Sequence, residues 1–311
     1  MKALTRVLGP SLVLFALAGS GLAQQTTAPG VPVSITITAE ADHGKVVPTL
    51  SREDVAVFQG KEKRPVTDLT PLGQGNQPMQ LLMLFSDSAR ASFNTEITTI
   101  KQFITSLPAS TEVGVGYMRN GTNQMVANFT RDHASAANAI RLVSGPGGAD
   151  VSPYDSVSEA IKNWPKSSVE RREIVMISSG VEGLGGGFTS DNPYVGRAIS
   201  DAQKAGIVVY TIYTPGVGHY GHAYWRATWG QNFLSQLADE TGGDSYIIGF
   251  GSPVSFQPFL QEISEHLKHQ YRLTFDAKPE KKAGLQPIRV RAVEKNASIA
   301  APDRVFVKAG V

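Results

Sequence analysis

Four short apolar runs in the middle of the chain most constrain the fold that it can adopt. Each run is continuous rather than alternating, which is typical of strands buried on both faces, as in parallel sheets. The runs are LLMLF (81–85), VGVGY (113–117), IVMI (174–177) and IVVYTIY (207–213). Segments with helical periodicity lie between and after them: 93–106, 133–143, 154–163, 194–205, 230–240 and 257–268. Strands that alternate with helices in this way predict an α/β fold with a doubly wound, mostly parallel sheet.

Strand-like segments flank this region on both sides. The sequence alternates with period two from Val33 (VSITIT), and alternation returns after Gln270 in QYRLTFDA, PIRVRAVE and RVFVKAG. Because an isolated pair of strands is marginal in water, we expect the two flanks to pair into one small β-sandwich, with the α/β domain inserted between them. The predicted divisions are an N-terminal β region (31–70), a Gly- and Pro-rich linker (71–78), the α/β domain (79–269) and a C-terminal β region (270–311).

The first 23 residues have the features of a secretory signal peptide. A basic start is followed by an apolar run (7–18) and by small residues that favour cleavage after Ala23. Residues 24–30 then form a flexible lead. An uncleaved anchor is the alternative, but the run is shorter than the about 20 apolar residues of a membrane span. We expect a secreted or periplasmic protein with no membrane span after cleavage, and the lack of cysteine means that the core alone holds the fold.

The charge balance argues against a nucleic-acid partner. The chain has 29 Lys and Arg residues against 27 Asp and Glu residues, but Lys2 and Arg6 lie in the signal segment, which leaves 27 against 27. A net charge of zero offers no basic stripe for a row of phosphates. The glycines at 185–187 lack the Lys and the following helix of a phosphate-binding loop, so we expect no nucleotide either.

Three segments of the chain resemble a known family. LLMLFSDSARAS, GGADVSPYDSV and RREIVMISSGVEG, in that order and at that spacing, look like the three ligand-bearing loops of a von Willebrand factor A (VWFA) domain. SREDVAVFQGKEKRPV before them and QYRLTFDA after them resemble the flanks of a bacterial family of secreted VWFA-related proteins, described from acidobacteria. The resemblance covers almost the whole mature chain and implies a Rossmann-like domain. Its strand ends usually hold Mg²⁺ in a site called MIDAS, which binds a carboxylate of a protein partner.

The first MIDAS loop departs from the family's pattern, which is Asp-x-Ser-x-Ser directly after the first strand. Alignment by the apolar run places Ser86 at the Asp, Ser88 at the first Ser and Arg90 at the second. A shift by one residue places Asp87 at the Asp, but alanines then replace both hydroxyls. Neither register rebuilds the motif, and the positive charge of Arg90 disfavours a dication.

The other two loops are also altered. Where the family has a Thr before a Tyr-Asp pair, this chain has Ser152 and Pro153 before the pair, whose Asp is Asp155. Where the family has Ser-Asp-Gly, Ser179 replaces the Asp. Because hydroxyls replace two carboxylates, we expect a degenerate MIDAS that holds no metal, and no cofactor, magnesium included. A rearranged oxygen set of Asp87, Asp150 and Glu182 is the alternative, although no spacing requires it.

Several of these residues also have a purely structural interpretation. Asp155 would stabilise the first turn of a helix through the helix dipole. The serines of the first and third loops would satisfy backbone groups at strand ends. His266 and His269 lie at the end of the last predicted helix, where cationic side chains complement the dipole.

The segment 214–232, TPGVGHYGHAYWRATWGQN, concentrates aromatic and basic residues beyond the end of a strand. Ligands of open α/β sheets bind on this side, and exposed aromatics with an arginine suit a protein or carbohydrate contact. The candidate partner-binding residues are His219, Tyr220, His222, Tyr224, Trp225 and Arg226. Alternatively, Trp225 and Trp229 begin the next helix and cover the sheet edge. The two histidines could also chelate a transition metal, but the segment offers no third ligand.

Catalytic motifs are missing from the sequence. It contains no G-x-S-x-G, no H-E-x-x-H and no cysteine nucleophile. We therefore expect an exported, non-enzymatic binding or adhesion module that engages a protein partner, in the envelope or outside the cell, through loops at the carboxyl edge of its sheet and without metal. The alternatives are a structural or assembly component of the cell envelope with a relic metal site and, third, an enzyme such as a hydrolase.

Overall fold

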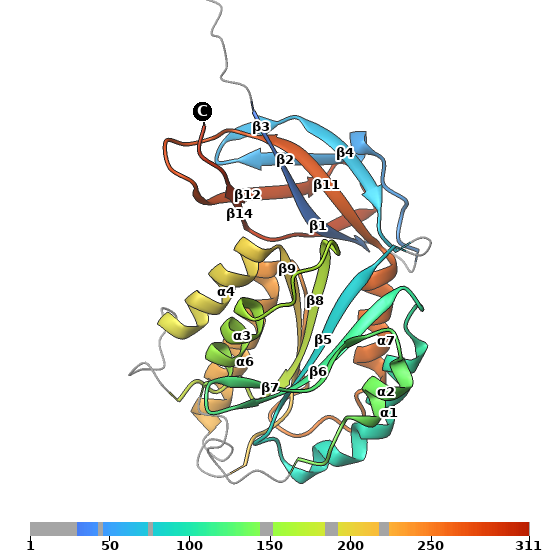
Figure 1. The fold of residues 1–311 in the computed structure, drawn as a ribbon. Coiled ribbons are helices and arrows are strands. Elements are labelled where there is room, and N and C mark those ends of the chain that lie inside the picture. The colour runs from blue at the N-terminus through green and yellow to red at the C-terminus, as the bar shows by residue number, and fades with distance from the viewer. Residues whose placement is uncertain are drawn as a thin grey trace, which may run out of the picture.

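The protein has two parts, an α/β domain and a β-sandwich, which lie end to end (Figure 1). The computed structural model describes residues 30–42, 46–73, 77–143, 152–183, 192–217 and 224–310. The arrangement confirms the predicted fold class, a doubly wound, mostly parallel sheet inserted between N- and C-terminal strands that form a small sandwich. The predicted signal peptide lies outside these ranges. Within them, no helix combines the length and the apolar character that crossing a membrane requires.

A six-stranded sheet with the order β10-β9-β8-β5-β6-β7 forms the centre of the α/β domain. Its strands are β5 (Met79–Ser86), β6 (Thr111–Arg119), β7 (Thr122–Thr130), β8 (Arg171–Ser178), β9 (Ile207–Tyr213) and β10 (Ser245–Tyr246). All neighbouring pairs are parallel except β6 and β7, which are antiparallel. Every residue of β5 and β9 is buried, which is the physical reason for their continuous apolar sequences.

The edge strand β7 has no counterpart among the predicted strands. Its sequence, TNQMVANFT, contains few apolar residues, and most of its side chains are exposed or half-buried. Because β7 pairs on one side only, it does not need the apolar sequence that identifies a central strand.

Helices cover both faces of the sheet (Figure 1). One face carries η2 (Ala91–Glu96), α1 (Ile97–Ser106), α2 (His133–Asn138) and α7 (Gln257–Lys268). The other face carries α3 (Pro153–Lys162), α4 (Pro193–Ala205) and α6 (Tyr224–Thr241). Each face has its own cluster of buried apolar side chains, so the two cores lie on either side of one sheet.

Two helices have bounds that differ from the predicted ones. α2 ends at Asn138 instead of continuing to residue 143, because the Tyr117 hydroxyl holds the backbone of Arg141 in a non-helical course. This hydroxyl donates to the Arg141 carbonyl (2.7 Å) and accepts from its N–H (2.9 Å). α6 begins at Tyr224 and not at residue 230, so Gly230 lies inside the helix. A Cβ at Gly230 would lie 2.3 Å from a backbone oxygen of the loop after β8, so the glycine permits close packing there.

The sandwich consists of two four-stranded sheets with the orders β13-β1-β11-β4 and β14-β12-β2-β3. Its elements are β1 (Val31–Ala41), η1 (Arg52–Asp54), β2 (Val55–Gln59), β3 (Glu62–Arg64), β4 (Val66–Pro71), β11 (Gln270–Ala277), β12 (Gly284–Ala292), β13 (Ala297–Ala300) and β14 (Arg304–Val307). β1 and β11 pair antiparallel, from Val31 opposite Ala277 to Thr38 opposite Gln270. Each sheet contains strands from both flanks of the α/β domain, and their buried faces form a third core.

Arg171, at the amino end of β8, connects the two parts. It is buried and donates to the carbonyl oxygens of Leu72 (3.0 Å) and Leu267 and to Oε1 of Gln270 (2.7 Å). These partners belong to the two places where the chain passes between the parts. Glu173 lies beside Arg171, with Oε1 3.8 Å from Nε. Burial raises the pKa of Glu173 to about 8, so this carboxyl is largely protonated at neutral pH and carbonyl oxygens hold the arginine.

Candidate functional site

The carboxyl ends of the parallel strands lie at the end of the α/β domain that is far from the sandwich (Figure 1). The strand order reverses between β5 and β8, and open α/β sheets bind ligands at such a switch point. The loops after β5, β8 and β9 meet there. Arg90 N–H donates to the Pro215 carbonyl (3.0 Å), and Thr214 N–H donates to the Ser178 carbonyl (3.0 Å). The fold thus brings the loops with the predicted MIDAS positions to one place.

Asp87 is the carboxylate nearest the end of β5, and two arginines neutralise it. Its side chain is 2% exposed. Arg141 Nη1 donates to Oδ1 at 2.7 Å, and Arg119 Nη1 lies 3.5 Å from Oδ2. The hydrogen bond with Asp87 is the main cause that raises the pKa of Arg141, whose guanidinium also stacks 4.0 Å above the Tyr117 ring. Both carboxylate oxygens therefore face cations.

The serines of the first and third loops are occupied by local hydrogen bonds. Ser86 and Ser88 are buried, and their hydroxyl oxygens lie 3.1 Å apart. Ser178 Oγ accepts from the Gly180 N–H (3.1 Å), and Ser179 Oγ accepts from the Val181 N–H (3.5 Å). The third loop thus uses its hydroxyls to hold its own backbone, as the structural interpretation expects.

The second loop supplies a helix cap. Ser152 is the N-cap of α3, and its Oγ accepts from the Asp155 N–H (3.4 Å) and donates to Oε2 of Glu182 (2.8 Å). Glu182 is buried, at 2% exposure. Asp155 lies in the first turn of α3 and forms an ion pair with Arg197 (3.2 Å). Both acidic side chains therefore already have partners of their own.

These contacts do not fit a magnesium ion. Mg²⁺ needs hard oxygen ligands that it does not share with cations, whereas Arg141 and Arg119 hold both oxygens of Asp87. Of the alternative oxygen set, Asp150 lies outside the described residues. In the described part of the chain, neither Asp87 nor Glu182 belongs to a group of three closely spaced metal-ligating side chains.

The aromatic segment 214–232 is described only in part: His219, Tyr220 and His222 lie outside the described residues. Tyr224 and Trp225 form the first turn of α6 and are 69% and 50% exposed. The Arg226 guanidinium lies 5.1 Å from the Trp225 ring. Trp229, one turn further, packs inward, with its ring 5.6 Å from that of Phe233. Of the two tryptophans, only Trp229 packs against the core.

Three further exposed apolar residues follow β10. Ile248 is 61% exposed, Phe250 38% and Val254 100%. The Phe250 ring lies 4.1 Å from that of Tyr224, and Gln231 of α6 donates to the Gly249 carbonyl (2.6 Å). We call the set of Tyr224, Trp225, Ile248, Phe250 and Val254 the apolar rim.

The apolar rim lies at the carboxyl edge, next to the loop after β5. Ser252 Oγ and Ser92 Oγ are 2.7 Å apart, and the Phe256 N–H donates to Glu96 (2.8 Å). The residues after β10 are absent from the sequence-based candidates because they show neither helical nor alternating periodicity.

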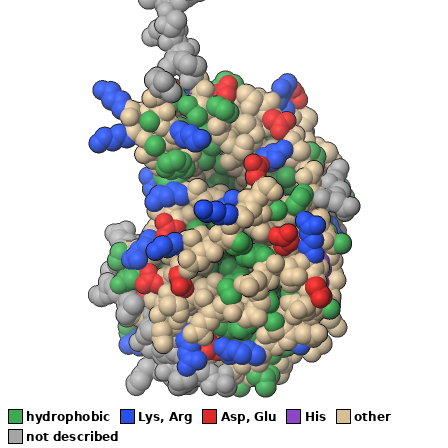
Figure 2. All heavy atoms as spheres, in the orientation of Figure 1, with side chains coloured by type: hydrophobic (Ala, Val, Ile, Leu, Met, Phe, Trp, Pro, Cys, Tyr) green, Lys and Arg blue, Asp and Glu red, His purple; other side chains and the backbone are tan. Residues whose placement is uncertain are grey.

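Charge is mixed on the face of the molecule drawn in Figure 2. Lys and Arg side chains are interspersed with Asp and Glu side chains over both parts of the protein.

The fold and the loops define the class of the protein. Counted from β5, the strand order is that of the Rossmann fold. Together with the antiparallel edge strand and helices on both faces, it gives a Rossmann-like, VWFA-like domain carried on a discontinuous β-sandwich.

Comparisons with known proteins give no family name. No family model matches the chain, and no curated protein matches it. Similar solved structures include the conserved hypothetical protein BatB from Bacteroides thetaiotaomicron, with 17% identity and a TM-score of 0.43 over 61% of this chain and 97% of that one. An aerotolerance-related membrane protein from Bacteroides fragilis NCTC 9343, with multiple mutations to serines, has 14% identity and a TM-score of 0.44 over 61% of this chain and 98% of that one. The SpRpn10 VWA domain has 16% identity and a TM-score of 0.39 over 60% of this chain and 95% of that one.

Proposed function

We propose that this protein is an exported, non-enzymatic binding module that engages a protein partner at the carboxyl edge of its sheet. The observation that carries the proposal is the apolar rim. Five large apolar side chains are exposed at one end of the α/β domain, close to the switch point of the sheet. Grouped exposed apolar residues mark interaction sites on soluble proteins more often than single ones do.

The composition of the rim favours a protein as the ligand. Tyr and Trp are enriched among the residues that dominate binding energy, and Arg is enriched with them. Tyr224 and Trp225 stand on a helix, so their positions are fixed before binding. The Arg226 guanidinium lies 5.1 Å from the Trp225 ring and places a positive charge beside it.

Binding at this edge is proposed to be independent of metal. In a MIDAS the metal ion attracts a carboxylate of the partner, but here Arg141 and Arg119 already neutralise Asp87. The same arginines are about 40% exposed, so they can attract acidic groups without a metal ion.

The titratable groups support a binding role over a hydrolytic one. Three side chains with strongly raised pKa values, Glu173, Tyr210 and Tyr246, are all buried. At the carboxyl edge, Asp87, Asp155 and Glu182 are held by arginines or a serine. A general base needs to reach a substrate proton, and these side chains are engaged within the fold. Export, to the periplasm or beyond, rests on the signal-like first 23 residues.

A pull-down from an envelope extract tests the proposal. The purified protein should retain a specific partner with equal yield in the presence and absence of a chelator. Trp225→Ala should weaken binding of that partner by about 30-fold or more, as loss of an aromatic anchor does. Phe306→Ala is the matched control, because this aromatic residue is 39% exposed but lies on β14 of the sandwich.

The outcomes separate the proposal from its alternatives. A partner lost equally in both variants would show that the rim is not the contact surface. A partner lost only with the chelator would refute metal independence. Failure to retain any partner would favour the structural or assembly role, and turnover in a panel of hydrolase substrates would favour an enzyme.

A further inference from the structure

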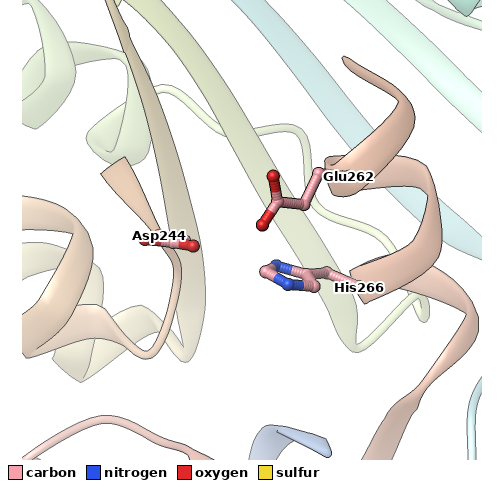
Figure 3. Close-up of side chains that lie close together, drawn as sticks. All are labelled: Asp244, Glu262 and His266. Atoms are coloured by element: carbon pink, nitrogen blue, oxygen red, sulfur yellow. The ribbon is translucent and has the colours of Figure 1, made fainter. Parts of the chain in front are cut away.

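A cluster of ionisable side chains lies between the edge strand β10 and the C-terminal half of α7 (Figure 3). Asp244 directly precedes β10, and Glu262 and His266 lie one turn apart on α7. The three side chains point toward one another, although they come from two separate elements. One ligand atom of each lies within 4.8 Å of the ligand atoms of the other two.

These side chains converge without forming bonds to one another. Asp244 Oδ1 accepts from the Ser245 N–H (2.6 Å). Within the described ranges, the side chains of Glu262 and His266 have no hydrogen bond and no ion pair, although their backbones belong to α7. Two carboxylates held close together repel each other unless a cation lies between them. The arrangement therefore surrounds a common point instead of forming a direct ion pair.

Tyr246 gives a second, independent observation. The residue is only 6% exposed, and its hydroxyl oxygen is buried with no hydrogen-bond partner in the described part of the chain. The Tyr246 ring stacks on that of Phe259 (5.5 Å), which lies one turn before Glu262 on α7, so the phenol packs between β10 and this helix. An unsatisfied buried hydroxyl is unfavourable. A ligand or ordered water between the carboxylates would supply the missing partner.

A third carboxylate contributes from the sandwich. Glu40 lies near the end of β1, opposite Ser298 of β13. Its pKa is raised mainly by burial, while His266 lowers it and the charges of Asp244 and Glu262 raise it. Acidic groups of both parts of the protein thus add to the negative field at this point, which favours a cation.

The ligand set indicates the class of cation. We propose that Asp244, Glu262 and His266 form a binding site for a divalent transition-metal ion, with zinc the best match. Imidazole nitrogen together with carboxylate oxygen suits Zn²⁺, whereas Mg²⁺ and Ca²⁺ prefer oxygen alone.

The geometry is compatible with a tetrahedral ion after a small adjustment. At bond lengths of about 2.1 Å, the ligand atoms of a tetrahedral zinc ion lie about 3.4 Å apart. Glu262 is exposed and can change rotamer to close the remaining distance. Three protein ligands leave one position open for a water, to which Tyr246 can donate. The ion would fasten α7 to the turn before β10 next to β1, at the junction of the two parts and away from the proposed partner surface.

Titration of the chelator-treated protein with ZnCl₂ tests this site. Calorimetry at neutral pH should show one zinc ion bound per chain with micromolar affinity, unaffected by a large excess of Mg²⁺. Asp244→Asn, Glu262→Gln and His266→Gln should each weaken binding about tenfold or more. Zinc should raise the melting temperature of the wild type and leave that of His266→Gln unchanged. Cobalt, used as a coloured substitute, should give an absorption band that His266→Gln removes.

Two control variants separate this site from other zinc ligands. Glu265→Gln changes an exposed carboxylate on the same helix, which pairs with Lys268, and it should keep the wild-type affinity. The double variant His219→Gln/His222→Gln should keep it too. Three results would each overturn the proposal: His266→Gln binds zinc as tightly as the wild type, the double variant loses zinc, or the wild type binds zinc only with millimolar affinity. The melting curve of His266→Gln without zinc should match that of the wild type. The variant is then folded, and its loss of zinc binding is not caused by unfolding.

Discussion

Glu173 should make the protein less stable as the pH rises, and Glu173→Gln should remove that dependence. The side chain is fully buried, and burial raises its pKa to about 8 because the charged form is poorly solvated there. Arg171 lies 3.8 Å away but directs its donors to the backbone carbonyl oxygens of Leu72 and Leu267 and to the side-chain Oε1 of Gln270. The arginine therefore stays charged and hydrogen-bonded when Glu173 is neutral.

The magnitude follows from the two pKa values of this carboxyl. In the unfolded chain its pKa is the ordinary 4.5, so between pH 4.5 and about 8 the folded protein binds a proton that the unfolded chain releases. The free energy of unfolding is therefore highest below about pH 4.5 and falls as the pH rises through this window. At about 1.4 kcal/mol for each tenfold change in proton affinity, the total loss is about 5 kcal/mol, of which about 3 kcal/mol has occurred by pH 7.

Urea denaturation at a series of pH values from about 4.5 to about 9 measures this effect. Glutamine is neutral at every pH of the series. The free energy of unfolding of Glu173→Gln should therefore equal that of the wild type at about pH 4.5 and exceed it by about 5 kcal/mol at about pH 9. Glu170→Gln is the control, because Glu170 is exposed and pairs with Arg272 at 3.2 Å. Parallel pH profiles of the wild type and Glu173→Gln would refute the reasoning, since they would mean that Glu173 is ionised in the fold.

Three further predictions concern the carboxyl edge. Trp225→Ala should lower the free energy of unfolding by about 1 kcal/mol or less, because half of this residue is exposed. Trp229→Ala should lower it by about 3 kcal/mol, because Trp229 packs against the core. Urea denaturation of both variants measures the difference, and equal losses would place Trp225 in the core. Gly180→Ala should lower the free energy of unfolding by about 2 to 4 kcal/mol in the same assay. Gly180 has φ +65°, and the Cβ of an alanine there would lie 2.3 Å from the Gly230 carbonyl oxygen. Calorimetry with MgCl₂ should show no binding tighter than millimolar, because Arg119 and Arg141 hold both oxygens of Asp87. A tighter magnesium site that Asp87→Ala abolishes would contradict this prediction.

The fold was predictable wherever burial determines the sequence. β9 (207–213) and α7 (257–268) have the predicted bounds, because one is buried along its whole length and the other has a single apolar face. Edge strand β7 and the short strands β10 and β13 carry no such pattern. The predicted pairing of the two flanks followed from a physical need, since neither has enough strands to form a sandwich alone.

The site was less predictable, because its important contacts join residues far apart in the sequence. Motif comparison located the loops, but it could not show that Asp87 pairs with Arg141, 54 residues further along the chain. Exposure of the apolar rim also depends on tertiary packing. Trp225 and Trp229 lie four residues apart on the same side of α6, but only Trp229, one turn further into the helix, packs against the core. Glu262 and His266 have a readable helical spacing, but Asp244 joins them only in the fold.

The discontinuous sandwich imposes an order of events on folding. Ser34 and Thr274 form a hydrogen bond although they are 240 residues apart, and closing so long a loop in an unfolded chain costs entropy. The α/β domain is continuous in sequence and, once folded, holds Leu72 against Gln270, with N–H donating to the carbonyl at 2.8 Å. We therefore expect the α/β domain to fold first and to shorten the search that brings β1 to β11, so that the sandwich forms last. Until then the strands of residues 31–71 have unpaired edges, which makes them the segment most exposed to aggregation during folding.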